Sequence, residues 1–205
     1  HISDVHLEAG FSAVALSQFF NKRFVGWANL FLRRRKYYAD AFVKMQALGA
    51  LVDEANVDVV LHTGDYTALG TVPELELARQ VVDPLTKAPH GFATVPGNHD
   101  VYLDDGIGVF ERIFDDLRVS GAPDLAVHGR WPLVRFFGDH VAVIGIDSTR
   151  PNPPIRRSSG RVPEAQLDGL RMALADPRFA GNIVFAMTPY APRLSSGHPD
   201  TKKQH

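Results

Sequence analysis

Three short clusters of polar residues carry side chains that can bind metal ions. They are Asp4-Val5-His6, Gly64-Asp65 and Gly97-Asn98-His99-Asp100. Residues two apart in an extended strand face the same side, so Asp4 and His6 would reach one ion if the backbone stays extended there. The Asp65 carboxylate can bridge two cations. Because carboxylate, amide oxygen and imidazole together suit Mn, Fe or Zn, the clusters predict a site for such metals.

Each cluster also has a plainer interpretation. Asp4 could cap a turn beside a partly exposed His6, and Gly-Asp after a strand is ordinary turn chemistry. His99 could be a surface histidine in a turn. The joint pattern favours a metal site, because three strand ends in succession each supply oxygen or nitrogen ligands.

The elements that must position these clusters follow from hydrophobic periodicity. Apolar runs of strand length alternate with helix-period stretches, which predicts βαβ units. The expected strands are Val57–Leu61, Phe92–Val95, Leu133–Phe137, Val141–Ile146 and Ile183–Met187, and the expected helices are Ala39–Ala55, Pro73–Asp83 and Pro163–Ala175. Open α/β sheets hold their sites at the carboxyl ends of strands. The second and third clusters follow predicted strands, as such a site requires.

Composition excludes several classes of protein. The chain has 205 residues, 45% of them hydrophobic and 22% charged, which argues for a folded domain and against disorder or a coiled coil. A net charge of -1 gives no clear nucleic-acid surface. The absence of cysteine excludes thiolate zinc sites and cysteine nucleophiles, and it fits a reducing compartment. We therefore expect a cytoplasmic protein whose metals have nitrogen and oxygen ligands.

With the three clusters in this order, the sequence resembles the calcineurin-like metallophosphoesterase superfamily. The stretch from Val143-Ile144-Gly145-Ile146-Asp147-Ser148 through Ser159-Gly160-Arg161-Val162 to Gln166-Leu167 resembles its class III cyclic-nucleotide phosphodiesterase branch. The resemblance implies an α/β fold in which two packed mixed β-sheets are flanked by helices, a four-layer αββα sandwich. It also implies one domain over residues 1–205, truncated at both ends, whose C-terminal strands are missing.

The resemblance further implies a ligand set and a reaction. Asp4 and His6 would bind one divalent metal, Asp65 would bridge two, and Asn98 would bind the second. His99 would be the general acid for the leaving oxygen, and Asp100 would orient its imidazole. On this basis we expect a phosphodiesterase that activates water at a dinuclear centre of Mn, Fe or Zn and hydrolyses a small-molecule phosphoester.

Two departures from the family pattern leave an alternative open. Pro189 stands where a histidine ligand is expected, and its side chain has no donor atom for a metal. The G-H-x-H motif is absent before His205. The alternative is a catalytically impaired protein that keeps the metallophosphoesterase fold as a binding or scaffold protein.

Residues 11–38 form an unusual segment, with an aromatic and apolar stretch followed by Arg33-Arg34-Arg35-Lys36. We expect a helical insertion or lid here. Peripheral membrane contact through residues 11–36 would make the protein a membrane-surface lipid phosphoesterase, whereas the plainer interpretation is an amphipathic helix packed on the domain. Outside the clusters, His62 is expected to be a partly buried strand residue. Four further histidines are expected to face solvent: His90, His128, His140 and His198.

Overall fold

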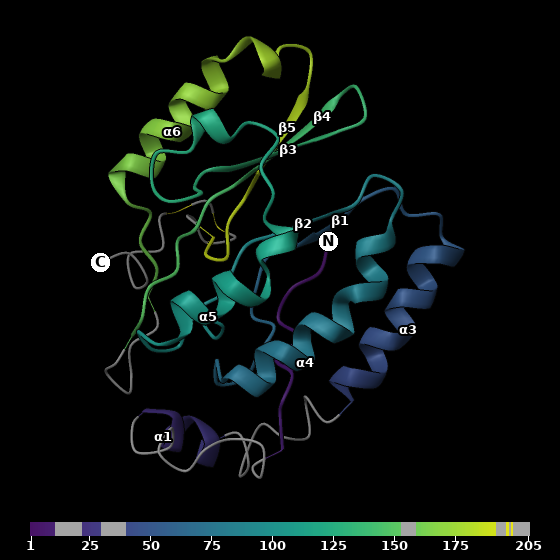
Figure 1. The fold of residues 1–205 in the computed structure, drawn as a ribbon, viewed down its shortest axis with the longest axis vertical. Helices are drawn as coiled ribbons and strands as arrows, with labels where there is room; N and C mark the ends of the chain where they lie inside the picture. The colour runs from purple at the N-terminus through teal and green to yellow at the C-terminus, as the bar shows by residue number, and fades with distance from the viewer. Residues whose placement is uncertain (11–21, 30–39, 153–158, 192–195, 197, 199–205) are drawn as a thin grey trace.

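Two small β-sheets lie face to face between helices in the computed structural model of the chain (Figure 1). The structure describes residues 1–10, 22–29, 40–152, 159–191, 196 and 198. Within these ranges the chain is α/β, with five α-helices and five strands. Every strand is three to five residues long, and each lies close to its predicted position.

The first sheet pairs β1 (Val60–His62) with β2 (Phe92–Thr94) in parallel. The N-terminal segment runs beside β1, where Ile2 forms a parallel bridge with His62 and the Ile2 amide donates to the Leu61 carbonyl oxygen at 2.9 Å. Three segments far apart in the sequence therefore approach the same end of this sheet. Each is followed by one of the polar clusters.

The second sheet has the order β3-β4-β5. The strands β3 (Leu133–Phe137) and β4 (Val141–Gly145) form the predicted hairpin, and β5 (Ile183–Met187) pairs with β4 in parallel. This sheet is mixed, as expected. β5 is its edge strand among the described residues, and it carries the exposed side chains of Ile183 and Phe185.

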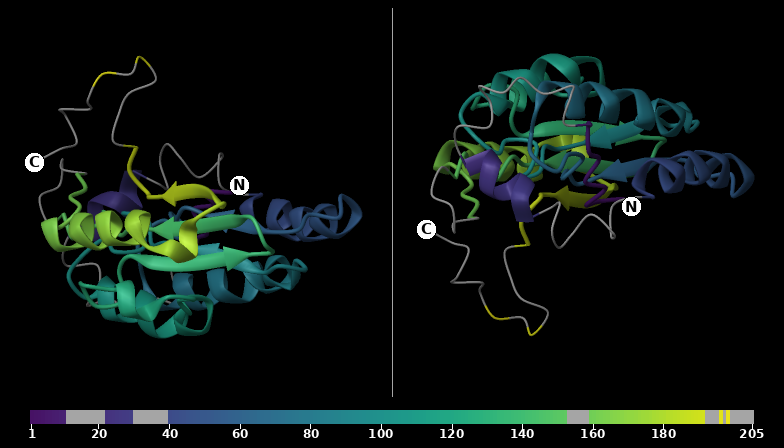
Figure 2. Two further views of the ribbon diagram at one scale, coloured as in Figure 1. Left: turned by 90° about the horizontal axis from the view of Figure 1, so that it is seen from above. Right: turned by 90° about the horizontal axis from the view of Figure 1, so that it is seen from below.

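Helices cover the outer faces of both sheets, which gives four layers. The outer face of the first sheet packs against α3 (Ala41–Glu54), α4 (Val72–Val82) and α5 (Gly106–Ile113). The second sheet packs against α6 (Glu164–Ala175). In Figures 1 and 2 the strands lie between α6 and the pair α3 and α4.

The core between the sheets follows from strand alternation. Leu61 and Ala93 point from the first sheet toward Leu133 and Val143 of the second, whereas their neighbours Val60 and Phe92 point toward the helices. Because successive side chains of a strand face opposite sides, each short apolar strand contributes to two cores. The predicted αββα sandwich is confirmed.

Some elements were not predicted from the sequence. Helix α5 was missed, because its eight residues begin with Gly-Ile-Gly and are too few to show a helical repeat of apolar residues. Among the residues that the structure describes, four 3-10 turns connect the longer elements: η4 (Asp83–Lys87), η5 (Asp115–Leu117), η6 (Pro123–Leu125) and η7 (Pro177–Phe179). Helix α1 (Lys22–Asn29) lies within the expected insertion 11–38, and the rest of that segment lies outside the described residues. In the described part of the chain, no helix has the length and apolarity to span a membrane.

Candidate metal centre

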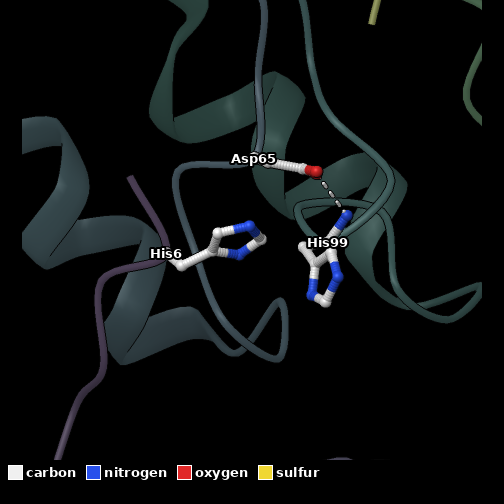
Figure 3. A group of neighbouring side chains, drawn as sticks. All are labelled: His6, Asp65 and His99. Carbon is white, nitrogen blue, oxygen red and sulfur yellow. Dashed lines mark hydrogen bonds between the residues drawn. The ribbon is translucent and has the colours of Figure 1, made fainter. Parts of the chain in front are cut away.

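Three potential ligand residues meet where the first sheet ends. His6, Asp65 and His99 each offer a ligand atom, and these atoms lie within 4.8 Å of one another. Figure 3 shows the three side chains converging from three separate segments. Two of the residues are expected metal ligands, and the third is the expected general acid.

Two glycines hold the second and third clusters together. Gly64 has a φ of +90°, and a Cβ atom there would lie 2.1 Å from the Gly97 nitrogen. A Cβ atom on Gly97 would lie 2.0 Å from the Asp65 nitrogen. Only glycine permits this backbone approach. The contact lets the His99 amide donate to Asp65 Oδ1 at 2.8 Å, so the glycines directly determine the site geometry.

The backbone is strained at three of the four expected ligands. Asp4, His6 and Asp65 have φ values of +58°, +52° and +57°, and the only other described non-glycine residue with positive φ is Asn56. Such conformations are costly and cluster at functional sites. The condition stated for Asp4 and His6, an extended backbone, is therefore not met. The two side chains still meet, with Asp4 Oδ1 3.6 Å from His6 Nε2, on left-handed backbone.

His6 is oriented for binding through Nε2. Its ring is buried, and Nδ1 lies 3.2 Å from the Thr67 carbonyl oxygen, which can only accept, so Nδ1 must carry the proton. Nε2 faces Asp4, whose Oδ1 is 3.6 Å away, and its lone pair would bind a cation held between the two side chains. A histidine that donates its other nitrogen to a carbonyl is typical of metal sites.

The charges at Asp4 and His6 support each other. The contact with His6 and the hydroxyl of Ser3 lower the pKa of Asp4 to about 2, against the opposing effect of burial. Burial opposes the charged form of His6, but Asp4 and the charge of Asp65 outweigh it and raise the pKa of His6. The site therefore has a negative potential that suits a cation.

His99 is held in a fixed orientation above Asp65. Its Nδ1 donates to the Ala68 carbonyl oxygen at 2.7 Å, which leaves Nε2 on the opposite side of the ring. The ring meets that of His6 edge-on with centroids 4.6 Å apart, and it faces Tyr102 at 5.5 Å. His99 is half-buried, as a residue that must reach a substrate should be.

Asp100 does not have the geometry expected for it. Its carboxylate is fully buried and accepts from the amides of Thr67 at 3.0 Å and Gly97 at 2.8 Å, and from the Thr67 hydroxyl. The Nδ1 proton of His99 goes to Ala68 instead. Burial and the nearby charge of Asp65 raise the pKa of Asp100 above its usual range. Asp100 thus supports the loops, and the role of orienting the imidazole passes to a backbone carbonyl.

Thr67 is a site residue that the sequence reasoning missed. It is fully buried, its carbonyl orients His6, and its amide and hydroxyl donate to Asp100. Its hydroxyl also lies 3.1 Å from the His99 carbonyl oxygen and accepts from the Gly70 amide at 3.2 Å. A threonine two residues after Gly-Asp gives no strong signal by type, so only the fold reveals its position.

The remaining predicted residues lie where the sequence placed them along the chain. Asn98 is half-buried in the turn between Gly97 and His99. Pro189 is half-buried just after β5 and offers no donor atom. His62 ends β1 as expected, but it is fully buried rather than partly buried, with Nδ1 accepting from the Gly64 amide at 3.1 Å and burial lowering its pKa to about 3. The four histidines expected in solvent are exposed: His90, His128, His140 and His198.

The donor set fits a divalent metal. An imidazole nitrogen and carboxylate oxygens converge, and the Thr67 carbonyl oxygen holds the His6 ring in place through Nδ1. Asp65 uses one oxygen for the His99 amide. These are nitrogen and oxygen ligands, as the absence of cysteine requires.

Comparison with known proteins defines the class of protein. The family model for calcineurin-like phosphoesterases matches residues 1–166, which include all three clusters, the first sheet with its helices, and the β3–β4 hairpin. The chain belongs to this family, and it is a phosphoric ester hydrolase of the metallophosphoesterase type. The family uses divalent metal ions. Among curated proteins, no sequence matches the chain.

Proposed function

We propose that the protein is a phosphodiesterase that hydrolyses a small-molecule phosphodiester with two divalent cations. Asp4 and His6 would hold one cation, Asn98 the other, and Asp65 both. The observation that carries the proposal is the convergence of His6, Asp65 and His99 within 4.8 Å on left-handed or turn backbone. When bound, the cations would supply charge that neutralises the phosphate oxygens and lowers the pKa of a water molecule.

The protein's own residues then position the substrate and move one proton. Asp65 and His6 would hold the cations, whose charge would attract the phosphate to this end of the sheet. His99, protonated on both nitrogens, donates from Nδ1 to Ala68 and presents its Nε2 proton to the leaving oxygen. Because the Ala68 contact fixes the ring, that proton faces the site.

Hydrolysis of aryl phosphodiesters tests the proposal. The protein loaded with Mn should hydrolyse bis(4-nitrophenyl) phosphate faster than 4-nitrophenyl phosphate. His99→Ala should lower kcat about 100-fold or more, as expected for removing a general acid. The loss should be larger for a phenol leaving group than for 4-nitrophenol, because the poorer leaving group needs the proton more.

The exposed His128 provides a matched control, and His128→Ala should leave kcat unchanged. A metal-loaded protein that hydrolyses no phosphoester would contradict the proposal. Equal losses for both leaving groups would instead remove His99 from the role of general acid.

Pro189 favours a second candidate function, a binding or scaffold protein. This residue is half-buried just after β5 and offers no ligand atom. Calorimetric titration with Mn separates the two functions. Two tight sites support the enzyme, whereas one weak site or none supports the scaffold.

A membrane-bound phosphoester is the remaining candidate substrate. Phe24 and Val25 on α1 are 56% and 41% exposed. Arg23 of the same helix donates to the carbonyls of Leu69 and Gly70, next to the residue that orients His99. Sedimentation with anionic vesicles would detect this contact, and Phe24→Ser should weaken it. Unchanged sedimentation of the variant would contradict membrane contact through α1.

A further inference from the structure

A buried guanidinium borders two adjoining cavities next to α5. Arg118 follows η5 and is 2% exposed. The first cavity, of about 320 Å³, is also lined by Glu111, Arg112, Asp115 and Arg130. The second, of about 360 Å³, shares Arg118 and Arg130. Its apolar wall consists of Val119, Pro123 and Ala126. None of these residues belongs to the metal centre.

The hydrogen bonding of Arg118 is incomplete. Its Nε is buried and has no partner among the described residues. Its two terminal nitrogens, Nη1 and Nη2, donate to the Glu111 carbonyl oxygen and to Glu111 Oε1, each at 3.4 Å, which is long for a charged pair. The centroid of the Trp131 ring lies 5.3 Å from the central carbon of the guanidinium. A buried charged donor left unsatisfied is costly, so a ligand that accepts from it would be stabilised.

The second arginine strengthens the case for an anion. Arg130 lies near enough to help lower the pKa of Arg118, although burial is the larger cause. Arg130 pairs with Asp115 at 2.7 Å, and its side chain is half-exposed. Two guanidinium groups on one cavity repel each other, and an anion between them would remove that repulsion.

We propose that these cavities form a binding site for a small carboxylate with an apolar substituent. The charged residues that line the paired cavities are Arg112, Arg118, Arg130, Glu111 and Asp115. Their net charge is one positive charge, which matches a ligand with a single negative charge. A planar carboxylate can accept two parallel bonds from a guanidinium. The wall of Val119, Pro123 and Ala126 would contact the apolar part.

Calorimetry with benzoate tests the site in the metal-loaded protein, in chloride buffer. Benzamide is the neutral control of equal shape, and it should bind at least about tenfold more weakly. Arg130→Gln should weaken benzoate binding about tenfold or more. Arg171→Gln is the matched control, because Arg171 is an exposed arginine on α6, paired with Glu164 and Asp168. It should leave benzoate binding unchanged.

Arg118→Gln should remove benzoate binding, with thermal melting used to verify its fold. If that variant does not fold, Arg130→Gln decides the question, because its half-exposed side chain is not part of the core. Equal affinities for benzoate and benzamide would overturn the proposal. Benzoate binding that survives Arg130→Gln unchanged would also overturn it, because such binding would lie elsewhere, at the metal centre for example.

Discussion

Thr67 shows that the orientation of the site residues depends on groups that no sequence motif identifies. Its backbone and hydroxyl connect His6, Asp100 and Gly70, and it is completely buried. The ligand candidates could be predicted from sequence, because carboxylates and imidazoles at strand ends are informative by type. The partners that orient them could not, because a carbonyl or a hydroxyl is present almost everywhere along a chain.

Removing the Thr67 hydroxyl should impair the site while largely preserving the fold. Thr67→Val keeps the shape of the side chain. It removes the acceptor of the Gly70 amide and one of the hydrogen bonds donated to Asp100. We expect activity on an aryl phosphodiester, or Mn affinity, to fall about tenfold, as is usual for partners of metal ligands. Thr67→Ser should restore most of the loss. A defect in Thr67→Ser as large as that in Thr67→Val would contradict the prediction, because the serine variant keeps the hydroxyl.

At the scale of elements, strand positions could be predicted but the contacts between their ends could not. The apolar runs that form β1 and β2 are plain in the sequence, as are the turns that follow them. The sequence does not show that Gly64 and Gly97 touch. Nor does it show that Asp4 and His6 leave the extended region. Both features arise from packing between segments distant in the chain, which local periodicity does not encode.

The glycine contact predicts opposite effects for two substitutions of the same kind. Gly97→Ala would place a methyl group 2.0 Å from the Asp65 nitrogen, so unfolding should become easier by more than about 3 kcal/mol. Gly108 lies in α5 with nothing within 4 Å of an added Cβ. Gly108→Ala should therefore stabilise the protein by about 0.5–1 kcal/mol through helix propensity. Urea unfolding measures both, and similar effects at the two positions would refute the close approach.

The start of α4 predicts a pH dependence of stability. Glu74 is 2% exposed and accepts from the amides of Leu69 and Thr71, each at 3.1 Å. Burial raises its pKa from 4.5 to about 7, even though these bonds and Arg23 oppose the shift. The folded state therefore binds the proton more tightly than the unfolded state. The contribution of Glu74 to stability is fully present below pH 4.5 and is lost as pH rises toward 7.

Glu74→Gln keeps an accepting oxygen and removes the ionisation. Between pH 5 and pH 8, the unfolding free energy of the wild type should fall by about 2 kcal/mol relative to that of Glu74→Gln. Comparing variant and wild type at each pH cancels the titration of the metal centre, which both share. A difference that is constant with pH, measured by urea unfolding, would mean that Glu74 does not titrate abnormally.

At the scale of the whole molecule, the layers supply rigidity and the loops supply chemistry. The fold class could be predicted because short, doubly buried strands alternating with helices leave few ways to bury their faces. The site could be predicted only as a set of loops at one end of the sheets. Its three converging residues come from the N-terminal segment and the ends of β1 and β2, so the site exists only when these segments are packed together.

This dependence predicts that metal stabilises the entire domain. The unfolded chain cannot bring His6 and Asp65 together, so a cation binds the folded state preferentially and shifts the unfolding equilibrium. At a Mn concentration about 100-fold above Kd, stabilisation should be about 2.7 kcal/mol. For a domain of this size the midpoint of thermal unfolding should rise by about 5–10 °C.

Asp65→Asn should abolish most of this rise, because it removes the carboxylate charge at the centre of the cluster. Asp53→Asn, at an exposed position on α3, is the control and should respond to Mn as wild type does. Differential scanning calorimetry with Mn or with chelator measures both. A wild-type midpoint that does not change with Mn would show that His6 and Asp65 do not share a cation. A cation bound to both residues must raise the midpoint, because unfolding separates them.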